Sequence, residues 1–492
     1  MSRLAASARG VPAPLALLLL AGLVLSVAWS VAMAPLQGFD EAEHAGYAIH
    51  LAETGRPPEA TGGGKVYSDA QAAALGPLGF GRTIANAEAK PPFHELQEEG
   101  FEAYEERLPA SDAASGEGPN PLGKNPPLYY AYEAIPYRIA KALGGGLFDQ
   151  LALMRLFSCV LFLGTIACAW LLSGEVFRRA LPRFTATAFV ALHPLAGYIS
   201  GVVNTDGMLM LWWTAFLWLA LRLNRLGPSP GRVAGLAAVS AASVLTHGRG
   251  LAILPVLLVV LAVVAIRHRP SPRTAGLSAA AALGCLAAGF VVLRAFTGAA
   301  GGGGALYGGE VNLGAASRFS VRQLLSQTWQ FYLPRLRIME SRLGPDYGFG
   351  QVWVETYFGG FASYDVNYPR WVYDAVSFGL VAGLLACLAL VVRRGVGILR
   401  KRWDQLAILL AAFGGMVGFL HVASYRALVN GSMDPLVTGR YLLPVTGVLA
   451  VAAGALVAAA GRRGPYLAGA LLVALLGLSL AGIALGMERF YA

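Results

Sequence analysis

The sequence predicts an all-α membrane protein that crosses the bilayer many times. Of its 492 residues, 56% are hydrophobic and only 13% are charged. The mean hydropathy is +0.56, which is far above the range of soluble domains. Apolar segments of about 20 residues, the length that a helix needs to cross the hydrocarbon core, recur along most of the chain. These observations exclude a soluble protein and predict a polytopic helical bundle.

Eleven apolar segments have the length and composition of membrane spans. They cover residues 13–35, 149–174, 184–203, 205–223, 233–247, 250–266, 274–294, 372–392, 405–422, 441–460 and 465–486. The first resembles a signal peptide in position. Its apolar core is long and its polar start is weak, so we expect it to stay as an anchor. We therefore predict about eleven transmembrane helices.

Basic residues follow every second span, which sets the orientation. The cytoplasmic side then carries Arg3, Arg9, Arg178, Arg179, Arg183, Arg222, Arg225, Arg232, Arg267, Arg269, Arg273, Arg393, Arg394, Arg400, Lys401, Arg402, Arg462 and Arg463. The segment 36–125 is acidic by contrast, with fifteen Asp and Glu against six Lys and Arg. The net charge of +10 thus reflects topology and not a nucleic-acid surface. We expect a cytoplasmic N-terminus and an extracytoplasmic C-terminus.

This topology divides the chain into five parts. The first helix (1–35) precedes an extracytoplasmic loop (36–148), and helices two to seven (149–294) precede a second large loop (295–371). Helices eight to eleven complete the chain (372–492). The cytoplasmic loops are too short for a nucleotide-binding domain, and no glycine-rich phosphate motif follows a strand. We therefore expect the chemistry on the outer side, where ATP and nucleotide sugars are not supplied.

An acidic cluster follows the first span directly. A helix is predicted from Gly38 to Glu53, and on it Asp40, Glu43, His44 and Tyr47 share one face by their spacing. A carboxylate at a membrane surface beside a histidine is a candidate proton acceptor. Asp40 is our first candidate for a catalytic base and Glu41 the second. A solvated helix N-terminus, where acids favour the helix dipole, is the alternative.

Further polar residues recur at the outer ends of other spans. Placing a charged side chain there costs free energy, so such a residue usually has an ionic partner or a function. Guanidinium groups at such positions suit a lipid phosphate. The candidate phosphate ligands are Arg249, Arg440, His247, Lys124 and Arg155; the candidate sugar or acceptor ligands are Glu43, His44, Asn204, Asp206, Tyr129, Trp353, Tyr357 and Tyr441. Snorkelling explains Arg155 equally well, and a helix cap explains Asp206 equally well.

Acidic and basic residues at one membrane face fit a reaction in which an acceptor attacks a sugar and a lipid phosphate is the leaving group. A phosphate leaving group needs positive charge and no protonating acid, so one carboxylate base suffices. This contrasts with the acid and base pair of a glycosidase.

Six short motifs resemble the GT-C superfamily of polytopic glycosyltransferases, and within it a bacterial group without assigned substrates. They are Phe39-Asp40-Glu41-Ala42-Glu43-His44, Asn125-Pro126-Pro127-Leu128-Tyr129-Tyr130, Arg155-Leu156-Phe157-Ser158, Val203-Asn204-Thr205-Asp206, Tyr357-Phe358-Gly359-Gly360-Phe361 and Gly439-Arg440-Tyr441-Leu442-Leu443-Pro444. Their order spans nearly the whole chain. The chain departs from the family at Asn125, where relatives often have His, and at His247 and Arg249, where many carry Lys.

The resemblance implies a GT-C-like fold and an inverting transfer of sugar from a polyprenyl-phosphate donor. The acceptor would be a cell-envelope glycan, lipid or protein, with Asp40 as the base. It implies a bacterial plasma-membrane enzyme of cell-wall or envelope biogenesis. A transporter or flippase of a lipid-linked saccharide and a non-catalytic assembly protein are the alternatives. Measuring whether the protein turns over a synthetic polyprenyl-phosphate sugar distinguishes these three functions.

The loop 295–371 is expected to roof the acceptor site, with the glycine run Gly301–Gly304 as a mobile entry. Trp353, Tyr357, Phe358, Phe361 and Tyr364 offer aromatic faces that stack on sugars; anchoring of an interfacial helix is the alternative. No cofactor is expected to be required. Asp40, Glu41 and Asp206 have the oxygens that could bind Mg²⁺ or Mn²⁺, although a monophosphate donor needs a metal less than a diphosphate.

Overall fold

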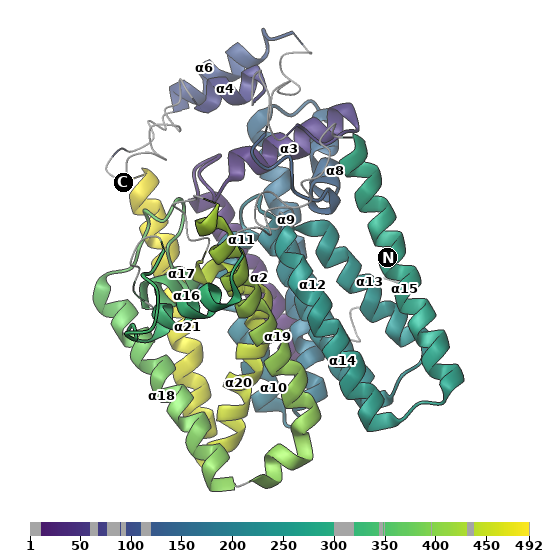
Figure 1. The fold of residues 1–492 in the computed structure, drawn as a ribbon. Coiled ribbons are helices and arrows are strands. Elements are labelled where there is room, and N and C mark those ends of the chain that lie inside the picture. Colours follow the sequence, from purple (N-terminus) through teal and green to yellow (C-terminus); the bar gives the residue numbers. More distant parts are fainter. Residues whose placement is uncertain are drawn as a thin grey trace.

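The computed structural model describes residues 11–59, 67–75, 89, 95–109, 120–299, 319–343, 348, 350–394, 396–430 and 437–491. Long helices run side by side to form the body of the molecule (Figure 1). Within the described ranges, pairing of extended chain is limited to one isolated bridge between Phe361 and Val366. The predicted all-α membrane fold is confirmed.

Eight of the described helical segments are long and apolar enough to cross a membrane. They contain α2 (Ala13–Ala32), α9 (Leu147–Val176), α14 (Ile253–His268), α15 (Pro272–Ala299), α18 (Arg370–Arg394), α19 (Val396–Val429), α20 (Thr446–Ala459) and α21 (Gly464–Tyr491). Short 3₁₀ turns, η1 (Gly248–Ala252) and η5 (Gly439–Val445), lead directly into α14 and α20. Both turns carry an arginine of the predicted site.

The other three predicted spans are helical but are not among these eight, so the count of eleven stays a prediction. The span 184–203 is two helices, α10 (Ala180–Ala191) and α11 (Pro194–Ser200). The break has a local cause, because Pro194 lacks an N–H and cannot continue the preceding helix. The spans that follow are α12 (Thr205–Leu226) and α13 (Pro230–Thr246), and α13 has only 17 residues.

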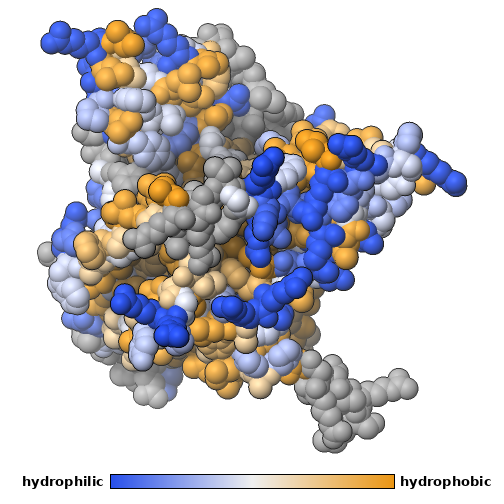
Figure 2. Space-filling view, turned by 90° about the horizontal axis from the view of Figure 1, so that it is seen from below, coloured by the Kyte–Doolittle hydropathy of each residue, from blue (hydrophilic) through white to orange (hydrophobic). Residues whose placement is uncertain are grey.

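Two helices lie across one end of the bundle, at the top of Figure 1: α3 (Glu41–Thr54) and α8 (Leu128–Ala142). The predicted helix after the first span is therefore confirmed, beginning at Glu41. Two short helices, α4 (Asp69–Leu75) and α6 (Glu95–Glu105), lie beyond them. Figure 2 looks at the opposite end, where many hydrophilic side chains are exposed among apolar ones.

The second predicted loop contributes three short helical elements to the described structure. They are α16 (Val321–Tyr332), the π-helical turn η4 (Gly350–Glu355) and α17 (Thr356–Phe358). The expected mobile entry Gly301–Gly304 lies outside the described residues. A last 3₁₀ turn, η6 (Gly461–Arg463), connects α20 to α21.

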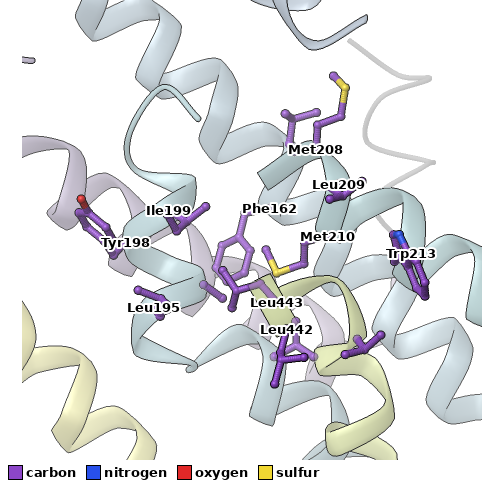
Figure 3. Packing of buried hydrophobic residues seen from close by; sticks show 14 of the residues in the cluster. Phe162, Leu195, Tyr198, Ile199, Met208, Leu209, Met210, Trp213, Leu442 and Leu443 are labelled. Atoms are coloured by element: carbon purple, nitrogen blue, oxygen red, sulfur yellow. The ribbon is translucent and has the colours of Figure 1, made fainter. Parts of the chain in front are cut away.

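The core joins the helices that carry the site. Figure 3 shows Phe162 of α9, Met210 of α12 and Leu443 of η5 packed beside α11, and all three side chains are fully buried. Because lipid tails are as apolar as these side chains, close van der Waals packing is what stabilises such contacts within a membrane bundle. Met210 lies one helical turn from Asp206, and Leu443 is close in sequence to Arg440. The packed layer therefore fixes the backbone from which both charged side chains project.

Candidate active site

Asp40 occupies the N-cap position of α3 in an unusual backbone conformation. Its φ of 50° and ψ of 24° lie in the left-handed region, which an L-residue other than glycine seldom adopts. Aspartate tolerates this region better than most residues. The Asp40 side chain is 58% exposed, although the helix that it begins is largely buried. The fold thus leaves the Asp40 carboxylate accessible at the start of a buried helix.

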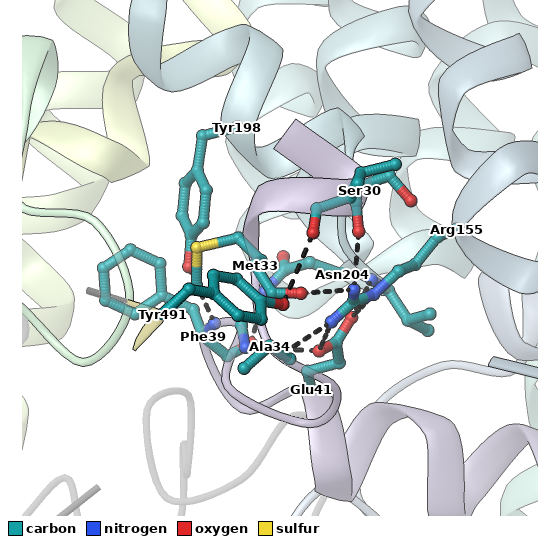
Figure 4. Close-up of polar contacts among 12 residues, drawn as sticks. Ser30, Met33, Ala34, Phe39, Glu41, Arg155, Tyr198, Asn204 and Tyr491 are labelled. Atoms are coloured by element: carbon teal, nitrogen blue, oxygen red, sulfur yellow. Dashed lines mark hydrogen bonds and ion pairs between the residues drawn. The ribbon is translucent and has the colours of Figure 1, made fainter. Parts of the chain in front are cut away.

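The next residue, Glu41, is fully buried and paired with Arg155 of α9 (Figure 4). Arg155 donates from Nε to Glu41 Oε1 at 2.8 Å and from Nη2 to Oε2 at 2.6 Å. The backbone N–H groups of Val203 and Gly38 donate to the same carboxylate at 3.0 and 3.2 Å. Arg155 also donates to the carbonyls of Ser30, Met33 and Ala34.

These bonds give Glu41 and Arg155 a structural task. Both oxygens of the carboxylate and all three guanidinium nitrogens already have protein partners. A bidentate pair of this kind has fixed geometry, so it fastens the loop after α2 to α9. Neither residue offers a free group to a substrate. We therefore do not propose Glu41 as a base or Arg155 as a phosphate ligand.

Three charged residues from separate parts of the chain meet beside Asp40. Arg249 Nη2 in η1 donates to Oδ1 of Asp206 in α12 at 2.5 Å. Arg440 of η5 lies with its Nε 3.6 Å from Asp206 Oδ2 and its Nη2 4.0 Å from Asp40 Oδ2. Asp206, Arg249 and Arg440 are all buried. The arrangement places two buried cations around one buried acid, with the accessible acid at its edge.

Several polar atoms of this cluster are buried without a hydrogen-bond partner. They are Oδ2 of Asp206, Nη1 of Arg249, and Nε and Nη1 of Arg440. Such atoms are uncommon in folded proteins, because each loses its bonds to water without replacement. Three of the four are guanidinium N–H donors, which match the oxygens of a phosphate or carboxylate. The cluster therefore has the chemistry of an anion site.

Aromatic rings hold the two guanidinium groups in place. The Arg249 guanidinium carbon lies 3.9 Å from the centre of the Tyr441 ring, and that of Arg440 lies 5.1 Å from the same ring. Phe39 faces Arg440 from another direction at 4.1 Å. Cation–π contacts of this kind stabilise a cation without consuming its N–H donors. Both arginines can therefore keep donors available for a ligand.

Asn204 positions the neighbouring backbone. Its Oδ1 accepts from the Asp206 N–H at 2.9 Å and caps α12, and its Nδ2 donates to the Phe39 carbonyl at 2.9 Å. The hydroxyl of Tyr198 accepts from the Phe39 N–H at 3.2 Å. Both backbone groups of the residue before Asp40 are thus fixed. Sequence reasoning named Phe39 only as part of a motif and missed Tyr198, because the contact between them joins residues 159 positions apart.

The face of α3 that carries His44 is buried against α8. His44 Nδ1 and the Tyr130 hydroxyl are 3.0 Å apart, and burial lowers the His44 pKa to about 4. Glu43 accepts from the Tyr67 hydroxyl at 2.7 Å. His247 Nδ1 accepts from the Arg249 N–H at 3.0 Å. Lys124 lies half-buried in the turn before α8.

Tyr129 belongs to a neighbouring buried group in α8. Its hydroxyl lies 3.1 Å from Ser158 Oγ, which donates to Glu133 Oε1 at 2.8 Å. The other oxygen of Glu133 is buried without a partner. Burial raises the Glu133 pKa to about 8, so this carboxyl is neutral at pH 7.

The aromatic residues expected to stack on sugars are mostly part of the core. Trp353, Tyr357, Phe358 and Phe361 are buried, with 8% exposure at most. Tyr357 is held by a 2.8 Å hydrogen bond to Thr446 Oγ1 and by the His193 ring. Tyr364 differs, because it is 40% exposed and packs on Phe39 at 4.6 Å between ring centres. Only Tyr364 of this set is both exposed and beside Asp40.

A pocket lies between α16 and α19. Its lining includes Gln327, Arg342, His421, Ser424 and Val437. Val437 precedes Arg440 by three residues, so one short segment borders both the pocket and the charged cluster.

Two of the acids considered for a divalent cation already have cationic partners in the structure. Glu41 and Asp206, two of the three acids considered for Mg²⁺ or Mn²⁺, are each paired with an arginine. A guanidinium in contact with each carboxylate opposes a second positive charge. Across the ranges that the structure describes, no three His, Cys, Asp or Glu side chains gather in a metal-binding group.

Comparison with known proteins gives a family for this chain. The sequence model of a family described as "Predicted membrane protein (DUF2142)" matches residues 23–474. No curated protein matches the chain. A crystal structure of ArnT from Cupriavidus metallidurans, bound to undecaprenyl phosphate, is 14% identical with a TM-score of 0.42. The similarity covers 96% of this chain and 74% of that one.

A second solved structure is similar over the same share of the chain. It is the oligosaccharyltransferase of Archaeoglobus fulgidus in its apo form, at 14% identity and a TM-score of 0.45. This chain is covered over 96% of its length and the archaeal chain over 56%.

Proposed function

The chain belongs to the DUF2142 family of predicted membrane proteins, and we propose that it is a lipid-phosphosugar glycosyltransferase. It would transfer a sugar, with inversion, from a polyprenyl-phosphate donor to a glycan, lipid or protein of the cell envelope. One observation carries the proposal. An accessible carboxylate, Asp40, lies 4.0 Å from a buried arginine, Arg440, whose Nε and Nη1 have no hydrogen-bond partner.

Asp40 is suited to act as the base. A hydroxyl of the acceptor would give its proton to the Asp40 carboxylate as the hydroxyl oxygen bonds to the anomeric carbon. The bond between that carbon and the phosphate oxygen breaks at the same time, and polyprenyl phosphate leaves with the electron pair. Attack from the side opposite the phosphate inverts the anomeric centre. The exposure of Asp40 supports this role, since an acceptor has to reach it from water.

Arg249 and Arg440 are suited to bind the phosphate. Negative charge grows on the phosphate as the glycosidic bond breaks, and fixed N–H donors in a buried site stabilise it without reorganisation. The unpaired Nη1 atoms of both arginines supply such donors. A phosphate leaving group needs no acid to protonate it, so this role requires only the two cations.

The placement of the arginines supports a lipid substrate. Arg249 lies in η1 and Arg440 in η5, and each turn leads into an apolar helix long enough to cross the membrane. A phosphate held there would leave its polyprenyl chain beside these helices, in the bilayer. We propose that the donor enters laterally from the plasma membrane and the acceptor from the extracytoplasmic side.

The test is turnover by purified protein in lipid nanodiscs. The substrate is a synthetic polyprenyl-phosphate sugar with a radiolabelled sugar, supplied with an envelope lipid and glycan extract. We expect release of polyprenyl phosphate and transfer of the label, both abolished by Asp40→Asn. Asp374→Asn, which removes an acid that is 68% exposed at the start of α18, is the matched control. In a separate assay with the protein in liposomes, movement of intact donor across the membrane would indicate a transporter. No turnover and no movement would indicate an assembly protein.

A further inference from the structure

Three side chains, those of Asn125, Tyr130 and His44, form a hydrogen-bond relay that ends at His44. Beside it, the Tyr47 hydroxyl donates to the backbone carbonyl of Asn125 at 3.0 Å. Asn125 Nδ2 donates to the Tyr130 hydroxyl at 3.0 Å. The Tyr130 hydroxyl and His44 Nδ1 are 3.0 Å apart.

The donors of this relay determine which nitrogen of His44 carries the proton. A tyrosine hydroxyl has one proton, and that of Tyr130 already accepts from Asn125. Tyr130 is fully buried, and among its described hydrogen bonds only the one to His44 can take its proton, so we infer that Nδ1 is the acceptor. In a neutral imidazole the proton is then on Nε2. Nε2 lies on the other edge of the ring, away from Tyr130.

Ring stacking prevents the relay from rearranging. Tyr47 and Tyr130 stack with centres 3.6 Å apart and an angle of 10°, and Tyr130 stacks on His44 at 5.8 Å and 26°. Tyr130 is fully buried and His44 is 4% exposed. A 180° flip of the imidazole would place the Cδ2–H edge, which cannot accept a hydrogen bond, where Nδ1 now meets the Tyr130 hydroxyl.

We infer that His44 is a neutral hydrogen-bond donor through Nε2, directed at an oxygen of the bound donor substrate, and that Asn125 and Tyr130 are positioning residues that set its tautomer. This inference rests on the proposed function for the identity of the substrate. It also separates His44 from the proton-transfer step, which is left to Asp40.

The charges around His44 agree with a neutral ring. Asp40 and Asp206 favour protonation, and Arg249 and Arg440 oppose it. Desolvation by burial is larger than any of these and lowers the His44 pKa to about 4. His247 shows the same tautomer by a different route, because its Nδ1 accepts the Arg249 N–H. In this arrangement both imidazoles have Nε2–H as a donor, beside the guanidinium groups of Arg249 and Arg440.

The first test compares substitutions that copy different ring nitrogens. His44→Gln places an amide N–H near the position of Nε2, whereas His44→Asn reaches only the position of Nδ1. We expect His44→Gln to keep kcat/KM within about threefold and to keep the acid limb of the wild-type pH profile. His44→Asn and His44→Ala should lose about tenfold, the size of one neutral hydrogen bond. A His44→Gln variant as inactive as Asp40→Asn would make His44 the base and overturn the inference.

The second test needs no activity, so it stays informative if the proposed function fails. In protein labelled with ¹⁵N-histidine, long-range ¹H–¹⁵N spectra distinguish the two tautomers. We expect His44 as the Nε2–H form in wild type and a mixture in Tyr130→Phe, which keeps the stacked ring and removes the hydroxyl. His247 is the internal control and should not change. An Nδ1–H signal for His44 in the wild-type protein would refute the relay.

Discussion

Arg155 and Glu41 form a buried two-point ion pair, with nitrogen-to-oxygen distances of 2.8 and 2.6 Å, immediately beside the exposed Asp40. The pair joins α9 to the first residue of α3. Because Glu41 also accepts from the N–H groups of Gly38 and Val203, it fastens the loop that holds Asp40 in its left-handed conformation. Glu41 and Asp40 are therefore adjacent in sequence but differ in role. Glu41 stabilises the loop through its ion pair, whereas Asp40 stays accessible.

Breaking this pair should unfold the site. Removing one partner of a buried ion pair leaves the other charge without compensation, which costs about 3–5 kcal/mol. We expect Arg155→Ala and Glu41→Gln each to lower the melting temperature of the protein in detergent and to abolish turnover.

The double variant Arg155→Met with Glu41→Leu is the control for this prediction. It removes both charges together, so it should be more stable than Arg155→Ala alone. A wild-type melting temperature in Arg155→Ala would show that the pair does not stabilise the loop.

Asp40→Asn should lower the rate of the reaction without weakening donor binding. The amide is nearly the same size as the carboxylate and also tolerates the left-handed region, so we expect folding and donor binding to stay close to wild type. Turnover should fall by about 10²-fold or more, because the variant cannot accept a proton. Single-turnover kinetics with labelled donor measures both quantities. Near-normal turnover would remove Asp40 from the mechanism.

Arg249→Gln and Arg440→Gln should weaken donor binding. Each removes a charged hydrogen-bond donor, which is worth about 1.5–3 kcal/mol. Binding of the donor, measured by titration in nanodiscs, should therefore weaken by about one to two orders of magnitude in each variant.

Arg370→Gln is the matched control, since Arg370 is 73% exposed at the start of α18. It should bind the donor as wild type does. If both site variants keep wild-type affinity, the phosphate is held elsewhere, and Lys124 in the turn before α8 is the next candidate.

The sequence predicted the charged residues of the site better than it predicted their partners. Asp40, Asp206, Arg249 and Arg440 were found because charge at the end of an apolar span is costly, and the structure brings them together. The pairing of Glu41 with Arg155 spans 114 positions and depends on how α3 packs on α9. Local pattern contains no such information, so Glu41 was grouped with its exposed neighbour Asp40.

Hydropathy had a similar limit for the fold. It located the helices, but it did not reveal that Pro194 divides one apolar segment into α10 and α11. It also gave no means of separating aromatic residues that face a sugar from those that face the core. Trp353 and Tyr357 were candidates by residue type alone, and the structure buries both.

Two tyrosines of the second loop should therefore respond differently to substitution. Tyr357→Ala creates a cavity in the core and should cost about 3–5 kcal/mol, seen as a lower melting temperature. Tyr364→Ala removes an exposed ring beside Phe39, so it should leave the melting temperature nearly unchanged and raise the acceptor KM at constant donor affinity. A raised acceptor KM in a fully stable Tyr357→Ala variant would restore the sugar-stacking interpretation of that residue.

Glu133 should make the protein less stable as the pH rises. Burial raises its pKa from 4.5 to about 8 in the folded state, whereas the unfolded chain ionises near the ordinary value. Between these two values the folded state binds more protons, so the free energy of unfolding falls by about 1.4 kcal/mol for each pH unit. Glu133→Gln removes the titration and keeps an oxygen that can accept from Ser158. Its melting temperature, compared with wild type, should therefore be relatively higher at pH 8 than at pH 5. A constant difference between the two proteins across that window would show that Glu133 is ionised in the folded protein.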